Sequence, residues 1–226
     1  MSLAVLIPAS GNAARMRGFP KFLLPNGNND ETLLEAHLRA VSIIADEILI
    51  AVNPIFLNIV QNASLNFYKS TLKSMETRSM TETVINLAEG SNADRFLVLM
   101  PDTAYIGESP YYKLLEEQND LNLSVWKIRN EQKGKLGQVQ LDDSNFVLDC
   151  VDKDQNCKHE FAWGVQLFTR KYLDYLNPEQ PHVGYGIMPA IVGGLKVGAS
   201  LVAGTYWDCG TPNEYVNFLK SSITSK

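Results

Sequence analysis

Apolar and polar positions follow two different periods along the chain, and the two periods alternate. Leu3 to Ile7 is a short apolar run that Pro8 ends, and Glu47 to Val52 is a second run of this kind. Between them, residues 32–45 place apolar side chains at helical spacing behind a start signal of Asp and Thr. This order predicts a βαβ unit at the N-terminus.

The same alternation continues to the C-terminus. Helical spacing predicts helices over 54–61, 81–89, 111–118 and 187–194, and a closing helix that begins at Pro212. Apolar runs predict strands over 95–100, 121–128, 138–141, 146–151 and 161–168, with a hairpin formed by 138–141 and 146–151. We therefore expect an α/β fold: a three-layer, Rossmann-like open sheet, mixed but mostly parallel, with helices on both faces and an antiparallel insertion in the second half. The length of 226 residues fits a single domain over 1–226.

Composition and charge exclude several kinds of partner. The chain has 20 basic and 25 acidic residues and no long run of either sign, so we expect no nucleic-acid partner. It contains no span of about 18 apolar residues, so no membrane partner is expected. The N-terminus lacks the basic segment of a secretory signal, which indicates a cytoplasmic protein. His37 lies on a helical apolar pattern, which favours a packed side chain over a metal ligand.

Small residues and then cations follow the first strand. The small residues occupy segment 8–14, and Arg15 and Lys21 come directly or shortly after it. Small side chains let backbone N–H groups approach a ligand closely, and a polyphosphate also needs nearby cations. The segment is therefore a candidate phosphate-binding loop, although it contains neither the Walker A pattern nor the dinucleotide fingerprint. The alternative is a turn rich in glycine and alanine with solvated arginines.

Two acidic residues follow apolar segments far apart in the sequence. Asp102 comes after the 95–100 run, and Asp208 comes after the apolar segment 199–203. A carboxylate at the end of a buried strand is unfavourable unless it is paired or binds a cation. The two acids are candidates for sharing one Mg²⁺ ion, and the alternative for Asp102 is an acid that caps a turn.

Six segments carry recognisable motifs: 7–25, 98–103, 136–139, 150–153, 163–168 and 206–215. The first combines Pro-Ala-Ser-Gly with Arg15 and Pro20-Lys21, and the last reads Tyr-Trp-Asp-Cys-Gly-Thr-Pro-Asn-Glu-Tyr. In this order they resemble the motifs of the sugar-phosphate nucleotidylyltransferases, the NTP transferase branch of the GT-A-like fold. The resemblance spans nearly the whole chain.

The resemblance implies a nucleotidyltransferase of sugar nucleotide biosynthesis, which condenses a nucleoside triphosphate (NTP) with a sugar 1-phosphate and releases pyrophosphate. It implies that Arg15 and Lys21 are catalytic residues on the NTP phosphates and that Asp102 and Asp208 bind Mg²⁺. The nucleotide-binding residues that it implies are Pro8, Ala9, Ser10, Gly11, Asn12, Ala13, Met80, Thr81 and Pro101. The residues that it implies for the sugar phosphate are Gly137, Asp152, Lys153 and Gly164.

Several points stay open at this stage. Ala13 stands where the family has a second glycine, and segment 78–83 replaces its Gly-Thr-Ala base loop, so the base is not assigned. The alternatives are a cytidylyltransferase acting on an alcohol phosphate and a catalytically silent regulatory protein that binds nucleotide sugars. The chain ends soon after Asp208, so we expect no left-handed β-helix domain. Assembly into a homo-oligomer is compatible with the sequence.

Overall fold

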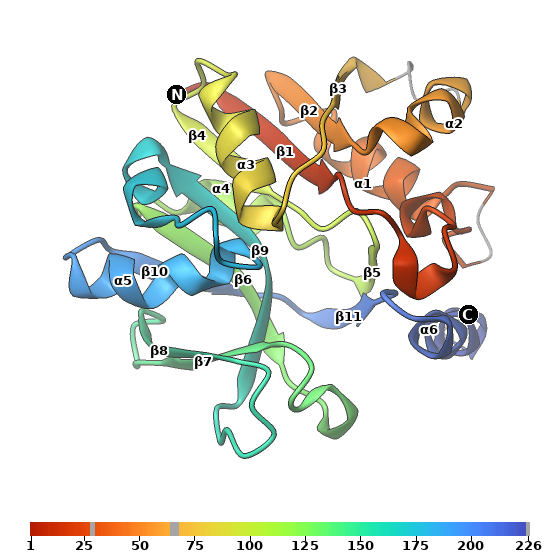
Figure 1. The fold of residues 1–226 in the computed structure, drawn as a ribbon. Helices are drawn as coiled ribbons and strands as arrows, with labels where there is room; N and C mark the ends of the chain where they lie inside the picture. The colour runs from red at the N-terminus through yellow and green to blue at the C-terminus, as the bar shows by residue number, and fades with distance from the viewer. Residues whose placement is uncertain (28–29, 64–67, 225–226) are drawn as a thin grey trace.

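A mixed β-sheet forms the centre of the molecule (Figure 1). In the computed structural model, which describes residues 1–27, 30–63 and 68–224, nine strands belong to this sheet. Its main path has the order β10-β6-β9-β4-β1-β2-β3. These strands are β1 (Leu3–Ala9), β2 (Glu47–Val52), β3 (Ser70–Ser74), β4 (Arg95–Val98), β6 (Leu121–Lys127), β9 (Phe161–Thr169) and β10 (Val197–Leu201). Strand β1 pairs in parallel with β2 and β4, whereas β9 runs antiparallel to both β4 and β6.

Helices cover both faces of the sheet because successive side chains of its strands point to opposite sides. On β1, Leu6 packs with Val84 on one side, while Ile7 packs with Leu34 on the other. Helices α3 (Met80–Glu89) and α5 (Ile187–Val192) cover the first face. Helices α1 (Leu33–Val41), α2 (Leu57–Asn62) and α4 (Tyr112–Glu116) cover the second.

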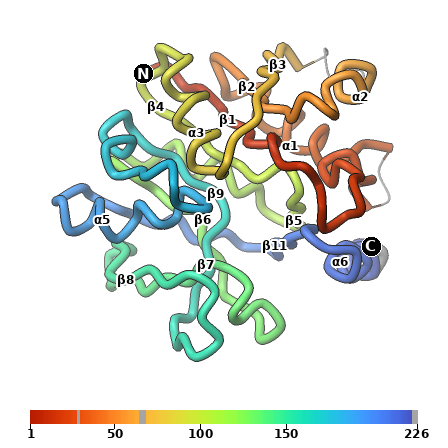
Figure 2. The backbone as a smooth tube through the Cα atoms, in the orientation of Figure 1, coloured from red at the N-terminus to blue at the C-terminus, as the bar shows by residue number. Residues whose placement is uncertain are grey.

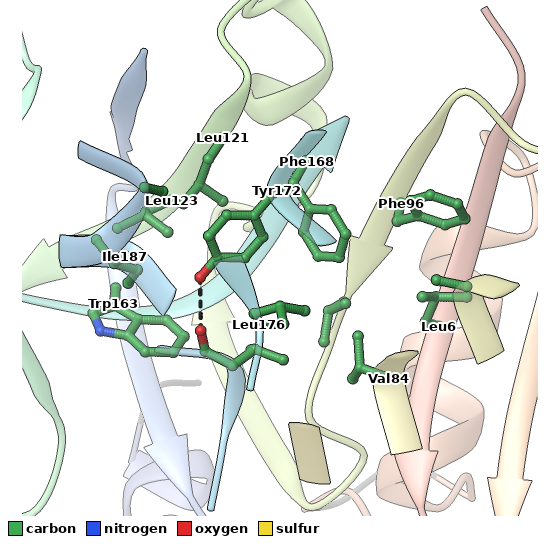
Figure 3. Close-up of a cluster of buried hydrophobic side chains, with 14 of the residues drawn as sticks. Leu6, Val84, Phe96, Leu121, Leu123, Trp163, Phe168, Tyr172, Leu176 and Ile187 are labelled. Atoms are coloured by element: carbon green, nitrogen blue, oxygen red, sulfur yellow. Dashed lines mark hydrogen bonds between the residues drawn. The ribbon is translucent and has the colours of Figure 1, made fainter. Parts of the chain in front are cut away.

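The core on the first face extends continuously across the sheet. Figure 3 shows Leu6, Val84 and Phe96 at one end of this core and Trp163 and Ile187 at the other. The Tyr172 hydroxyl donates a hydrogen bond of 2.6 Å to the Val183 carbonyl within it. The core therefore joins the N-terminal and C-terminal halves into one packed body.

Two antiparallel additions complete the fold. The hairpin β7 (Gly137–Leu141) and β8 (Val147–Asp152) pairs with β9 and projects from the main sheet (Figure 2). A separate two-stranded sheet pairs β5 (Thr103–Gly107) with β11 (Gly204–Asp208), and α6 (Pro212–Thr224) follows it. In this small sheet Asp208 lies opposite Thr103, so the two acid-bearing segments meet.

The expected fold class is confirmed, and the differences concern single elements. Strands β3, β5 and β11 are additional to the expected ones, and β10 overlaps the apolar segment 199–203. The helix expected over 32–45 ends at Val41. The N–H groups of Ile44 and Ala45 both donate to the Val41 carbonyl, so the chain turns there while its apolar spacing continues. Residues 170–175, for which no element was expected, form a 3₁₀ helix. No helix in the described part of the chain is long and apolar enough to cross a membrane.

Candidate active site

Two cavities open beside the carboxyl ends of β1 and β4, where open α/β sheets bind their ligands. The first has a volume of about 660 Å³ and is lined mainly by the segment after β1. The second has a volume of about 890 Å³ and is lined by residues from both halves of the chain. Arg15 and Asp102 line both cavities. Both volumes include space that is open to solvent at the mouths of the cavities.

The first cavity contains most of the residues expected around the nucleotide. From the expected set it is lined by Pro8, Ala9, Gly11, Asn12, Ala13, Arg15, Lys21, Pro101 and Asp102. Ala13 and Arg17 adopt left-handed backbone conformations, with φ of 55° and 54°, on either side of a short 3₁₀ helix over Ala14–Met16. A Cβ atom at Gly11 would meet no atom within 4 Å, so the loop leaves open space at this point.

Cations and an acid face each other at this loop. Lys21 Nζ lies 2.8 Å from Asp102 Oδ2, and the two side chains are only 13% and 23% exposed. Arg15 is exposed, and no described side chain forms a hydrogen bond or ion pair with its guanidinium. The loop therefore presents Arg15 as an unengaged cation. Lys21 would become a second one if Asp102 bound another cation.

Asp102 and Asp208 lie together at the boundary of the second cavity. The Cys209 N–H donates to the Asp102 carbonyl at 3.0 Å, and the Gly210 N–H donates to Asp208 Oδ1 at 2.8 Å. Burial and the nearby charge of Asp102 raise the pKa of the Asp208 carboxyl to about 6. The negative charges of the two carboxylates repel each other, and a bound divalent cation would reduce this repulsion.

This donor set fits a hard cation such as Mg²⁺. Magnesium is usually held by one or two carboxylates, while substrate phosphates and water complete its coordination. Within the described ranges, no group of three or more Asp, Glu, His or Cys side chains is arranged to hold a metal without such help. Asp102 and Asp208 would therefore bind the ion together with a phosphorylated substrate.

The second cavity contains the residues expected around the acceptor. From the expected set it is lined by Arg15, Met80, Asp102, Gly137, Asp152, Lys153, Gly164 and Asp208. A Cβ atom at Gly137 would lie 2.3 Å from Trp163 Nε1, and one at Gly164 would lie 2.7 Å from Tyr206 Cζ. The two glycines thus give room to the aromatic rings of the cavity wall.

Asp152 and Lys153 reach this cavity from the end of β8. Lys153 has a left-handed backbone with φ of 49°, and its N–H donates to the Leu136 carbonyl at 3.2 Å. Burial opposes ionisation of Asp152, but His182, Lys153 and Tyr185 outweigh it and lower the pKa of this carboxyl. Asp152 is therefore a carboxylate at neutral pH.

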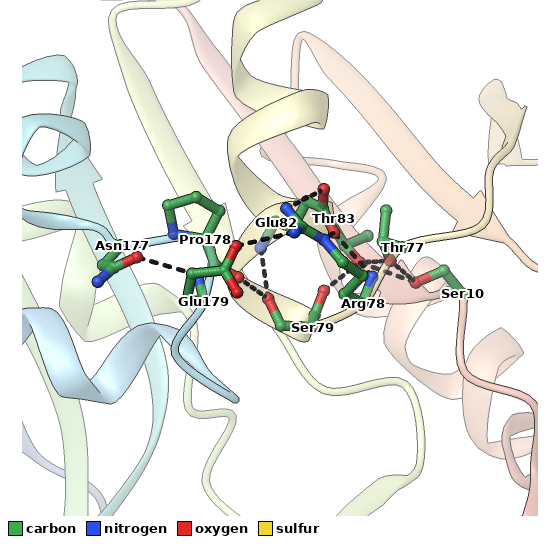
Figure 4. Close-up of polar contacts among 9 residues, drawn as sticks. All are labelled: Ser10, Thr77, Arg78, Ser79, Glu82, Thr83, Asn177, Pro178 and Glu179. Atoms are coloured by element: carbon green, nitrogen blue, oxygen red, sulfur yellow. Dashed lines mark hydrogen bonds and ion pairs between the residues drawn. The ribbon is translucent and has the colours of Figure 1, made fainter.

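Two of the residues expected to bind the nucleotide, Ser10 and Thr81, line neither cavity. Ser10 is buried, and its hydroxyl lies 2.9 Å from the Thr77 hydroxyl and 2.8 Å from the Thr83 hydroxyl (Figure 4). Thr81 is 1% exposed in the first turn of α3. These hydroxyl contacts join the phosphate-loop segment to α3, so the Ser10 side chain positions the loop.

The sequence left several cavity residues unassigned. They are Phe22 and Phe56 in the first cavity and Lys135, Trp163, His182 and Tyr206 in the second. Trp163 and Tyr206 lie within the motif segments 163–168 and 206–215, which was a usable signal. His182 follows a Pro-rich loop and belongs to no expected strand end, so no sequence signal predicts its position here.

Comparisons with known proteins show the family and the fold of the chain. A family model described as the MobA-like NTP transferase domain matches residues 5–174. A solved structure from Bacillus anthracis assigned as a glucose-1-phosphate thymidylyltransferase, in complex with sucrose, has a TM-score of 0.82 at 14% identity, covering 98% of this chain and 95% of that one.

Two further solved structures share the fold. A UDP-glucose pyrophosphorylase complexed with UDP-glucose has a TM-score of 0.78 at 13% identity and full coverage of both chains. The inositol-1-phosphate CTP transferase from T. maritima has a TM-score of 0.75 at 16% identity, covering 99% of this chain and 96% of that one. At these identities the likeness establishes the fold.

Proposed function

The chain belongs to the MobA-like NTP transferase family and is a nucleotidyltransferase, and from this premise we propose that it joins an NTP to a sugar 1-phosphate with Mg²⁺ as cofactor. The products are a nucleoside diphosphate sugar and pyrophosphate. The observation that carries the proposal is that Arg15 and Asp102 line both cavities, because the reacting phosphates must meet where the two substrates adjoin.

The acceptor supplies its own nucleophile in this reaction. A phosphate monoester is largely ionised at pH 7, so one of its oxygens attacks the α-phosphorus of the NTP while the bond to the pyrophosphate oxygen breaks. The protein's task is to align the two substrates and to neutralise charge. This agrees with a site whose residues are mainly small groups, cations and acids.

Each charged residue of the expected set has a role in this scheme. The backbone around Gly11–Ala13 borders the triphosphate, Arg15 holds the leaving pyrophosphate, and Lys21 neutralises charge on the α-phosphate. Asp102 and Asp208 would hold Mg²⁺, which when bound supplies positive charge at the α-phosphate oxygens. Lys153 binds the acceptor phosphate, and Asp152 binds another part of the acceptor.

A pyrophosphate-release screen tests the proposal. The common NTPs are combined with sugar 1-phosphates, inositol 1-phosphate and phosphocholine, each with Mg²⁺ and with EDTA. We expect Mg²⁺-dependent release with at least one sugar 1-phosphate. Release with an alcohol phosphate alone would favour the alternative acceptor class, which the fold shared with the inositol-1-phosphate CTP transferase makes worth testing. No release from any pair, with bound nucleotide detected, would favour the silent regulatory protein.

A further inference from the structure

The small sheet of β5 and β11, and not the main sheet, carries the two acids of the candidate metal site (Figure 1). Asp102 directly precedes β5, whose first residue, Thr103, lies opposite Asp208 at the end of β11. A sheet of two strands is only marginally stable by itself. The relative position of the two carboxylates therefore depends on contacts that fix the Thr103 end of this sheet to the rest of the molecule.

His37 makes such a contact from helix α1. Its side chain is 2% exposed, and its Nε2 lies 2.8 Å from the Thr103 carbonyl oxygen. The Thr103 hydroxyl donates in turn to the Met100 carbonyl at 2.7 Å, across the turn that contains Asp102. His37 lines neither of the two cavities. It therefore contacts the metal-binding segment through the backbone and has no direct access to a substrate.

The hydrogen bonds of His37 define one tautomer of its ring. A carbonyl oxygen can only accept, so Nε2 carries the proton and donates it to Thr103. Nδ1 is then an acceptor, and the hydroxyl of Tyr111, which is fully buried at the start of α4, donates to it. Burial lowers the pKa of His37 to about 4, so the ring is neutral at pH 7. The ring cannot rotate without losing both hydrogen bonds.

Apolar packing connects the same elements. Leu33, in the first turn of α1, belongs to one buried cluster with Ala104 of β5 and with Cys209, the residue after β11. The Cys209 N–H donates to the Asp102 carbonyl at 3.0 Å, which ties the two acid-bearing segments to each other. The apolar cluster fixes the distance of the small sheet from α1, and the more directional hydrogen bond from His37 fixes the orientation of the Thr103 peptide.

We propose that His37 is a positioning residue of the metal site: its hydrogen bond to the Thr103 carbonyl orients Asp102 relative to Asp208 and so sets the affinity of the site for Mg²⁺. Loss of a group that orients metal ligands typically lowers metal affinity by about 10–100-fold. The inference rests on the proposed function, because it requires that the two acids hold the metal. It gives a residue of α1 that contacts no substrate a part in metal binding.

The test measures metal binding without turnover. Mn²⁺ is the paramagnetic substitute for Mg²⁺, and inorganic pyrophosphate, the product of nucleotidyl transfer, supplies the phosphate oxygens. The enhancement of the water proton relaxation rate then gives the Mn²⁺ affinity of the complex. We expect His37→Leu, which removes both hydrogen bonds, to weaken Mn²⁺ binding about tenfold. His37→Gln, whose amide N–H can reach the Thr103 carbonyl, should recover most of the loss, whereas the shorter side chain of His37→Asn should not.

Ser91→Ala is the matched control. Ser91 is also buried, with 5% exposure, and its hydroxyl donates to Glu47 at 2.6 Å, at the start of β2 and so at the edge of the main sheet opposite to the site. This variant should lower the stability of the fold and leave the Mn²⁺ affinity unchanged. Tyr111→Phe keeps the buried ring, so it should fold even if His37→Leu does not, and it should weaken Mn²⁺ binding about two- to threefold.

Wild-type Mn²⁺ affinity in both His37→Leu and Tyr111→Phe would overturn the proposal, and so would an equal loss of affinity in Ser91→Ala. Asp208→Asn separates this failure from that of the metal assignment. If Asp208→Asn binds Mn²⁺ as tightly as the wild type, the two acids do not hold the metal, and both the Mg²⁺ part of the proposed function and this inference are wrong. If Asp208→Asn loses affinity and the His37 and Tyr111 variants keep it, only this inference is wrong. Absence of turnover with every sugar 1-phosphate would reject the proposed acceptor and leave the Mn²⁺ result valid.

Discussion

At the scale of single residues, the pKa values of Asp208 and His37 are shifted by their surroundings. Asp208 has a pKa raised to about 6 by burial and by Asp102, whereas burial lowers the pKa of His37 to about 4. His37 lies beside the segment that carries Asp102, because its Nε2 donates to the Thr103 carbonyl at 2.8 Å. The two groups affect stability in opposite directions as pH changes.

Asp208→Asn is expected to stabilise the metal-free protein while reducing activity. The pKa of Asp208 is higher in the folded than in the unfolded state, so its ionisation destabilises the fold increasingly as pH rises from about 4 to about 6. At pH 7 the variant should be more stable by about 2 kcal/mol, and the advantage should disappear below about pH 4. Urea unfolding in EDTA at several pH values measures this difference, and a variant less stable than the wild type at pH 7 would contradict it.

His37 makes the opposite contribution. Its pKa is lower in the folded than in the unfolded state, so the stability associated with it is complete above about pH 6.5 and is lost as pH falls toward 4. The advantage of the wild type over His37→Gln should therefore shrink by roughly 3 kcal/mol between pH 7.5 and pH 4. A stability difference between the two proteins that stays constant over this range would show that His37 has the same pKa in the folded and unfolded states, which would contradict the prediction. The sequence-based expectation of a packed His37 agrees with its 2% exposure.

At the scale of secondary-structure elements, the sequence predicted those whose side chains reach the core. Glu47–Val52 forms strand β2 with the expected bounds, because its apolar residues are buried. Strand β3 was missed because its sequence, Ser-Thr-Leu-Lys-Ser, has a single apolar residue and lies at the edge of the sheet. Strand β5 pairs with β11 across about 100 residues of sequence, and such a pairing has no local periodic signal.

The residues of the candidate site also divide into those that the sequence predicts and those that only tertiary contacts place. Arg15, Lys21, Asp102 and Asp208 were predictable because they directly follow strands or belong to motif segments. His182 and Tyr185 were not predictable, because a 3₁₀ turn and the loop before it bring them to Asp152. Tertiary contacts, and not local sequence, place this part of the acceptor cavity.

Two side chains at the N-terminus of α3, Ser79 and Arg78, contact the loop 177–182, and their contributions to the free energy of unfolding should differ. Ser79 accepts a hydrogen bond from the Glu82 N–H at 2.9 Å and donates one to Pro178, so it caps the helix and anchors the loop together. We expect Ser79→Ala to lower the free energy of unfolding by about 1–2 kcal/mol. Arg78→Ala should lower it by less than about 0.5 kcal/mol, because the Arg78 and Glu179 side chains are both 67% exposed. Chemical denaturation of both variants measures the two values, and equal losses would refute the assignment.

At the scale of the whole molecule, the two halves of the chain supply different parts of the site. The β1 loop forms most of the first cavity, and the hairpin β7–β8 with β9 and β11 forms much of the second. The continuous core in Figure 3 fixes the halves relative to each other. The two cavities adjoin at Arg15 and Asp102, which line both of them.

Because the two cavities would bind different substrates, we expect substitutions of their cationic side chains to change different kinetic constants. Arg15→Ala and Lys21→Ala should lower kcat/KM by about two to three orders of magnitude, because each removes a fixed charge from the reacting phosphates. Lys153→Ala should instead raise the acceptor KM about tenfold or more and the NTP KM less than about twofold, because it removes a charge that faces only the second cavity. Lys158, in the same connection between β8 and β9, borders a separate cavity, so Lys158→Ala should match the wild type. Steady-state kinetics with each substrate varied in turn gives these constants. Equal rises in both KM values for Lys153→Ala would mean that the two cavities do not bind the substrates separately.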